Sequence, residues 1–181
     1  MHKIIVSQFI TLDGVLDEPD KWSLDYWNDE IAQFKGDEMI NAGGLLLGRV
    51  TYDGFAAAWP DRPAEEGGEQ MNGMPKYVAT TTLDRADWQN TTLLKGDIIG
   101  QIKQLKAADG GDLLVYGSGT LIQTLIAHDL IDEYRLLVYP VVRGTGSHLF
   151  EDGAQTKLDL VEAKPVGSGV VALTYRARHD A

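Results

Sequence analysis

Uninterrupted apolar runs alternate along this chain with segments in which apolar residues recur every three or four positions. The clearest runs are KIIVSQF (3–9), GGLLLG (43–48) and DLLVY (112–116). Strands of a parallel sheet that is covered on both faces have this composition, because neither face needs a polar surface. Further strands are predicted at 76–80, at 90–94 and at 132–142, the last loosening near Pro140.

Helical spacing follows several of these runs. Residues 28–40 carry Ile31 and Phe34 on one face, with Asn28 available as an N-cap. A short helix is predicted from about Thr51, a longer one at 97–108, and an amphipathic one directly after the third run. The last segment, 158–178, contains two β-rich runs around Gly-Ser-Gly and predicts a terminal hairpin.

This order of elements predicts the α/β fold class. Strands that alternate with helices form a parallel sheet, and the terminal hairpin adds antiparallel strands. We therefore expect a mixed, mostly parallel central sheet with helices on both faces and a C-terminal antiparallel hairpin. The chain of 181 residues shows no internal repeat and no interior linker, so a single domain (1–181) is expected.

Composition excludes several classes of function. The net charge of −11 argues against a nucleic-acid partner, which requires clustered Lys and Arg. No apolar run approaches the roughly 18 residues of a membrane span, and the N-terminus does not resemble a signal peptide. Without cysteine there are no disulfides and no thiolate metal sites, and the four histidines lack metal-ligand spacing. No metal, no membrane and a cytoplasmic setting are expected.

A Gly-Ser-Gly-Thr turn at 117–120 stands where a predicted buried strand becomes a helix. Glycines are common in tight turns of any kind. Free N–H groups and the helix dipole at such a point also favour an anion, which Gly117 and Gly119 would allow to approach the backbone. Ser118 and Thr120 would then cap the helix and donate further hydrogen bonds. The local sequence leaves both readings open.

Two other strand ends carry similar chemistry. Gly48 and Arg49 follow the second run and precede Thr51, and a guanidinium suits phosphate. The strand at 76–80 ends in a run of threonines, with Arg85 close behind. Since ligands of open α/β sheets collect at the carboxyl ends of the strands, one long ligand with several phosphates would account for all three turns. A dinucleotide is the economical candidate.

The loop after the first strand is long and would cover a substrate. Asp13 and Trp22 would then lie near it, although Asp13-Gly14 is also a common turn dipeptide. Glu30 stands early in its helix. It either complements the helix dipole or faces the pocket, where it would hold a proton donor or bind a nitrogen-rich heterocycle.

Four segments in this order carry a family resemblance: SQFITLDG, LLLGRVTY, KYVATTTL and LLVYGSGTLIQTLIAHDLIDEYRLLVYPVVRGTGSHLF. The chain resembles the dihydrofolate reductase-like superfamily, and most closely the C-terminal reductase domain of the bifunctional riboflavin-biosynthesis deaminase–reductase. The likeness runs from about residue 3 to residue 176. It implies an NADPH-dependent reductase that acts on a small molecule, and relatives of this kind are often homodimers.

The resemblance also implies roles for individual residues. Residues matching the family's cofactor-phosphate turn are Gly48, Arg49 and Thr51; those on the adenosine phosphate side are Thr80 and Thr81; those around the pyrophosphate are Tyr116, Gly117, Ser118, Gly119 and Thr120. Thr11, Asp13 and Gly14 match the loop beside nicotinamide and substrate. Arg49, with Arg85, would favour NADPH over NADH.

The expected reaction is hydride transfer to a C=N or C=O bond, with Asp13 or Glu30 holding the protonating water or orienting the substrate. The zinc deaminase domain of the bifunctional enzyme has no counterpart here. The substrate therefore remains open between a pyrimidine ribosyl phosphate and a pterin. The alternative is a non-catalytic nucleotide-binding or sensory module that retains the NADPH site.

Overall fold

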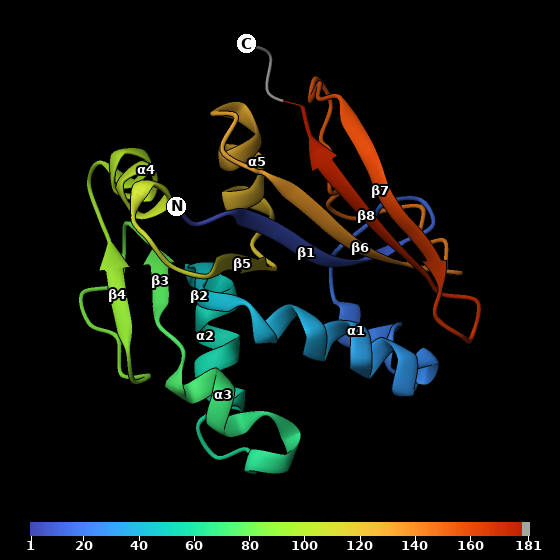
Figure 1. Cartoon of the computed structure of the whole chain (residues 1–181), viewed down its shortest axis with the longest axis horizontal. Coiled ribbons are helices and arrows are strands. Elements are labelled where there is room, and N and C mark those ends of the chain that lie inside the picture. Colours follow the sequence, from blue (N-terminus) through green and yellow to red (C-terminus); the bar gives the residue numbers. More distant parts are fainter. Residues whose placement is uncertain (179–181) are drawn as a thin grey trace.

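The computed structural model describes residues 1–178 and arranges eight strands in one sheet, in the order β4-β3-β2-β5-β1-β6-β8-β7 (Figure 1). The strands are β1 (Ile4–Thr11), β2 (Ala42–Gly48), β3 (Lys76–Ala79), β4 (Thr91–Leu94), β5 (Asp112–Tyr116), β6 (Glu133–Tyr139), β7 (Leu158–Pro165) and β8 (Val171–Ala177). All neighbours from β4 to β6 are parallel, whereas β8 is antiparallel to both β6 and β7. The predicted mixed, mostly parallel sheet with a terminal hairpin is confirmed.

The four predicted helices occur in the predicted order, and a further short helix, α3, lies between the second and third of them. They are α1 (Asp29–Ile40), α2 (Arg49–Ala58), α3 (Gly68–Gly73), α4 (Ile98–Ala107) and α5 (Gly119–Ala127), with 3-10 turns η1 (Pro19–Lys21), η2 (Leu24–Tyr26) and η3 (Ala64–Glu66). Asn28 caps α1 as expected, its side chain accepting from the Ile31 N–H at 3.0 Å. Asp97 caps α4 in the same way. Helix α2 begins at Arg49, two residues before the predicted start.

Alternate residues of the central strands face opposite helices. Ile4 and Val6 of β1 pack in a core with α4 and α5, whereas Ile5 packs in a second core with α2 and α3. Helix α1 covers a third hydrophobic cluster, formed around β6 and β8 on the same face of the sheet as α2. In Figure 1, α1, α2 and α3 lie below the sheet and α4 and α5 above it. Helices on both faces are therefore confirmed, and the apolar runs are explained.

At the centre of the sheet, the helices that follow two neighbouring strands leave to opposite faces. Strands β2 and β5 are parallel neighbours, yet β2 continues into α2 on one face and β5 into α5 on the other. Where consecutive helices leave to opposite faces, the carboxyl ends of the two strands form a crevice that commonly binds a ligand.

Across residues 1–178, no helix has the length and apolar character needed to cross a membrane. Within the same range, no group of three or more His, Cys, Asp or Glu side chains could hold a metal ion. His179 lies outside the described residues.

Candidate functional site

A cleft of about 1680 Å³ lies at the carboxyl ends of β3, β2 and β5 and extends over β1 towards α1. Its volume exceeds the several hundred Å³ that hold a typical small ligand, so the cleft is large enough for a long one. The predicted residues that line it are Gly48, Arg49, Thr51, Thr80, Thr81, Tyr116, Gly117, Ser118, Gly119 and Thr120. The structure thus brings the three predicted turns to one cavity.

Ser118 binds two of these turns to each other. Its Oγ accepts a hydrogen bond from the Gly48 N–H at 2.7 Å and donates one to Thr51 Oγ1 at 2.8 Å. The residue adopts a left-handed conformation (φ 64°) and makes no side-chain cap to α5. The interpretation of Ser118 as a helix cap is therefore wrong, because its hydroxyl is used across the crevice between β2 and β5.

Two glycines are explained by this contact between turns. A Cβ on Gly48 would lie 2.6 Å from Ser118 Oγ, and one on Gly117, whose φ is +62°, would lie 2.6 Å from Thr51 Oγ1. A Cβ on Gly119 would meet only Leu16, at 3.8 Å. Gly48 and Gly117 are thus required by the packing of the turns, whereas Gly119 leaves space beside the first turn of α5.

The donors around this crevice suit a diphosphate. Helices α2 and α5 both begin at it, and the first N–H groups of a helix have no acceptor within the helix. Their dipoles also favour negative charge at these ends. Thr81 adds an exposed hydroxyl, whereas Thr80 is buried and its Oγ1 accepts from the Thr82 and Leu83 N–H groups. Thr80 therefore shapes the turn after β3.

Two arginines, Arg49 and Arg62, add guanidinium donors to the cleft. Arg49 lines the cleft and pairs with Asp53 at 2.6 Å; both side chains are about half exposed, and such pairs are weak. Arg62, which the sequence interpretation missed, also lines the cleft and stacks on Trp59 at 4.7 Å. Arg85 lies outside the cleft lining, exposed and paired with Asp87. The glycine turns, helix ends and guanidinium groups together fit a dinucleotide phosphate chain.

The loop after β1 does not place its Asp-Gly turn in the cleft. Asp13 accepts hydrogen bonds from Thr11 Oγ1 at 2.6 Å and from the N–H groups of Gly144 and Arg143 at 2.7 and 3.2 Å. These bonds, that from Thr11 foremost, lower the pKa of Asp13 to about 2. Asp13, Thr11 and Gly14 are absent from the cleft lining. They join the loops after β1 and β6, and the structure does not bring them to the cleft, where the nicotinamide and substrate were expected.

The second half of the same loop lines the cleft instead. Leu24 and Trp27 contribute exposed apolar surface there, and Trp27 is 49% exposed. Trp22 packs edge-on against Tyr139 at 5.3 Å, and its Nε1 donates to the Asp17 carbonyl. The substrate contact predicted for Trp22 is thus corrected, since its ring is part of the packing and Trp27 is the tryptophan of this loop that lines the cavity.

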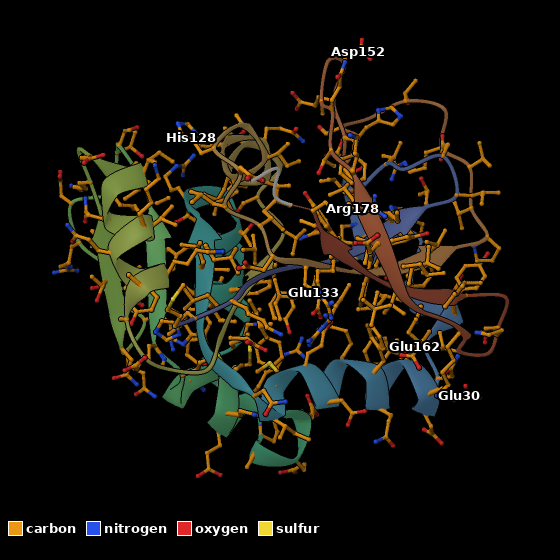
Figure 2. All side chains as sticks on the ribbon, turned by 45° about the horizontal axis from the view of Figure 1, so that its top comes forward. Glu30, His128, Glu133, Asp152, Glu162 and Arg178 are labelled. Carbon is orange, nitrogen blue, oxygen red and sulfur yellow. The ribbon has the colours of Figure 1, made fainter. Side chains whose placement is uncertain are left out.

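Glu30 also lies away from the cleft. It is exposed near the N-terminal end of α1 (Figure 2) and does not line the cavity. Glu38, two turns further along the helix, is only 2% exposed and lies beneath the cleft, bonded to Ser7 and Tyr116, which line it. Ile31, Lys35 and Glu38 recur at helical spacing, which is the signal that identifies the inner face of α1. We therefore replace Glu30 with Glu38 as the acidic group of this helix.

Glu38 is the centre of a buried polar cluster. Its carboxylate accepts from Ser7 Oγ at 2.8 Å, from Tyr116 Oη at 3.2 Å and from Lys35 Nζ at 2.6 Å. Burial, and secondarily the carboxylate itself, raises the pKa of Tyr116 well above its usual value. Burial lowers the pKa of Lys35, and Glu38 opposes that shift. Three of these four residues, Ser7, Lys35 and Tyr116, line the cleft.

Comparisons with known proteins agree with this arrangement. Residues 2–172 match the family model of the RibD C-terminal domain. The chain is 29% identical over 179 residues to the uncharacterized protein YyaP of Bacillus subtilis, covering 96% of this chain and 94% of that protein.

Solved structures show the same fold. A protein of Shewanella sp. PV-4 that is named for riboflavin biosynthesis superposes with a TM-score of 0.80 at 23% identity, over 98% of this chain and 99% of that one. Dihydrofolate reductase from Enterococcus faecalis, solved with NADP(H), superposes with a TM-score of 0.65 at 16% identity, over 98% and 97% of the two chains. At these identities the likeness shows the fold alone.

Proposed function

Because this chain belongs to the RibD C-terminal domain family, we propose that it is an NADPH-dependent reductase of a small heterocyclic substrate. The observation that carries the proposal is the bond from the Gly48 N–H to Ser118 Oγ, which holds the N-termini of α2 and α5 at one crevice. Two helix N-termini that converge on a glycine-lined cavity favour a diphosphate. The E. faecalis relative with this fold was solved with NADP(H).

The residues of the cleft would divide the cofactor between them. The first-turn N–H groups of α5 and α2 would hold the diphosphate, and Thr81 would donate to the adenosine side. Arg49 and Arg62 would contact the additional phosphate of NADPH, since a guanidinium binds phosphate through paired donors. The nicotinamide end would then lie over β1, near Ser7 and Phe9, where the cleft continues.

NADPH would supply a hydride to the carbon of a C=N or C=O bond. The electron pair of that bond moves to the nitrogen or oxygen, which takes a proton from water. The chain itself would orient the acceptor and limit the access of bulk water. Leu24 and Trp27 place apolar surface over this end of the cleft, which suits both tasks.

Calorimetric titration with NADPH and spectroscopic measurement of its oxidation test the proposal. We expect saturable NADPH binding, and turnover with at least one member of a panel of dihydropterins, pyrimidine ribosyl compounds and simple carbonyl compounds. The absence of heat with NADPH up to millimolar concentration would exclude the cofactor site and the reductase together.

One observation favours a second function. Neither Asp13 nor Glu30, the two predicted proton-handling residues, lines the cleft. A nucleotide-binding or sensory module would need the glycine turns and helix N-termini to bind the cofactor phosphates, and it would need no proton donor. Tight NADPH binding without oxidation across the whole panel would support this alternative.

A further inference from the structure

Lys35 is an ion-paired lysine whose ammonium group reaches the cleft. Nζ donates to Ser7 Oγ and to Glu38 Oε2, both at 2.6 Å, and the side chain is 19% exposed. The residue also lines the cavity. An ammonium group has three N–H donors. Two of them bond to Ser7 and Glu38, so the third is available to a molecule bound in the cleft that Lys35 lines.

Two hydrogen bonds and two aromatic rings restrict the position of this ammonium group. Nζ lies 4.2 Å from the centroid of the Tyr116 ring and 5.5 Å from that of Phe9. Glu38 in turn is fixed by Ser7 and Tyr116, in addition to Lys35 itself. A lysine is normally a flexible point charge. Here the charge is held at one place on the floor of the cavity, which is the arrangement that binding of a specific atom requires.

The surroundings of Lys35 suit a flat ring. Phe9 and Trp27 line the same part of the cleft, with ring centroids 6.4 Å apart, and Leu24 is 65% exposed beside them. Large apolar side chains rarely stay exposed in a concave site without a ligand to cover them. Their rings offer a stacking surface next to one N–H donor.

The charges at this end disfavour a phosphate. Asp17, Glu18 and Asp20 also line the cleft, and Glu18 pairs with Lys21 and Arg143. Glu38 offsets the charge of Lys35, and Arg135 on β6, the other cation that acts on Lys35, pairs with Glu133 at 2.6 Å. A phosphate beside Lys35 would therefore find a cation whose charge Glu38 already offsets, in a cleft that Asp17 and Asp20 also line. An uncharged ring would meet no such repulsion.

We propose that Lys35 is the substrate-binding residue of the cleft, and that its free N–H donates to the carbonyl oxygen or imine nitrogen of a flat heterocycle that carries no phosphate. This deepens the proposed function, because it identifies the class of substrate for the same site. It also assigns Glu38 and Ser7 as positioning residues that act through Lys35.

Calorimetry with lumazine (pteridine-2,4-dione) as the probe tests this assignment, at slightly acidic pH and with and without saturating NADP⁺. Lumazine is flat, lacks phosphate and has both carbonyl and imine acceptors. We expect Lys35→Met to weaken lumazine binding about ten-fold or more, the effect of losing a charged hydrogen bond, while NADP⁺ affinity stays within about two-fold. Ribose 5-phosphate, titrated in the same way, should not compete with lumazine.

Two further variants control for folding. Lys106→Met removes another ion-paired lysine, 18% exposed and bound to Asp132, that does not line the cleft; it should leave lumazine binding unchanged. Lys35→Met leaves Glu38 without its cation, so the double variant Lys35→Met/Glu38→Gln removes both charges and restores a neutral core. It should fold and still fail to bind lumazine tightly.

Equal lumazine affinity in the wild type and the double variant would overturn the assignment, as would a wild type that binds no lumazine. Competition by ribose 5-phosphate would overturn the phosphate-free class. The cofactor proposal is judged separately by the heat of NADP⁺ binding. If that heat is absent while Lys35→Met still abolishes lumazine binding, the reductase proposal fails and the lysine site stands.

Discussion

Arg49 and Arg85 both follow strands of the sheet, but only Arg49 lies at the cleft. Arg49 begins α2 and lines the cleft, where its exposed ion pair with Asp53 leaves the guanidinium free to exchange partners. Arg85 does not line the cleft and pairs with Asp87. A guanidinium contributes to phosphate binding only when the backbone places it at the phosphate.

Arg49→Ala should weaken NADPH binding about ten-fold or more and leave NADH binding nearly unchanged. The reason is that a charged contact to the extra phosphate contributes about 1.5–3 kcal/mol. Arg85→Ala is the matched control and should change neither affinity. Titration of both variants with both cofactors measures this, and equal losses for NADPH and NADH would contradict the assignment of Arg49.

At the scale of elements, the crevice depends on how closely two turns approach. The turn between β2 and α2 and the turn between β5 and α5 share the Ser118 hydroxyl. Gly48 is part of the same contact, because a side chain there would occupy the position of Ser118 Oγ. The relative placement of α2 and α5, and hence of their N–H groups, follows from this one packing contact.

Gly48→Ala should separate the turns, lower the free energy of unfolding by about 1–3 kcal/mol and weaken NADPH binding. Adding Ser118→Gly should recover part of the stability, since it removes the clashing hydroxyl and glycine adopts a φ of 64° without strain. Denaturant unfolding of the two single variants and the double variant measures the coupling. Strictly additive losses would show that the two residues do not act on one contact.

At the scale of the whole molecule, one buried cation affects stability without serving the cleft. Lys76 is fully buried, and its Nζ donates to the carbonyl oxygens of Met71 and Asn72 at the end of α3 and lies 4.2 Å from the Trp88 ring centroid. Burial lowers its pKa from 10.5 to about 8. Between these two values the unfolded chain holds the proton and the folded chain does not, so folding becomes more favourable as the pH rises.

Lys76→Met should remove this dependence. In the wild type, Lys76 adds to the free energy of unfolding as the pH rises above about 8, by at most about 3 kcal/mol when the pH reaches 10.5. Denaturant unfolding of both proteins between pH 7 and 9.5 measures the difference, which should grow with pH in favour of the wild type. A difference that stays constant over this range would show that Lys76 keeps an ordinary pKa when folded.

Local properties of the chain were predictable because they depend on near neighbours in sequence. Asn28 and Asp97 cap their helices through bonds three residues away, and the apolar runs mark strands whose two faces are both covered. The glycine turns likewise mark the strand ends of the cleft. These features determined the α/β class, the terminal hairpin and the phosphate side of the candidate site.

The tertiary structure decided which site residues are buried and with which residues they form hydrogen bonds. Glu30 and Glu38 stand on one helix. Helical spacing puts Glu38 on the same face as Ile31, and the packing of α1 on the sheet decides that this face lies inside and Glu30 outside. Asp13 and Ser118 bond to residues 131 and 70 positions away, across loops and strands whose order no local pattern specifies. Sequence thus determined which residues end the strands, and the strand order and helix rotation decided which of them meet.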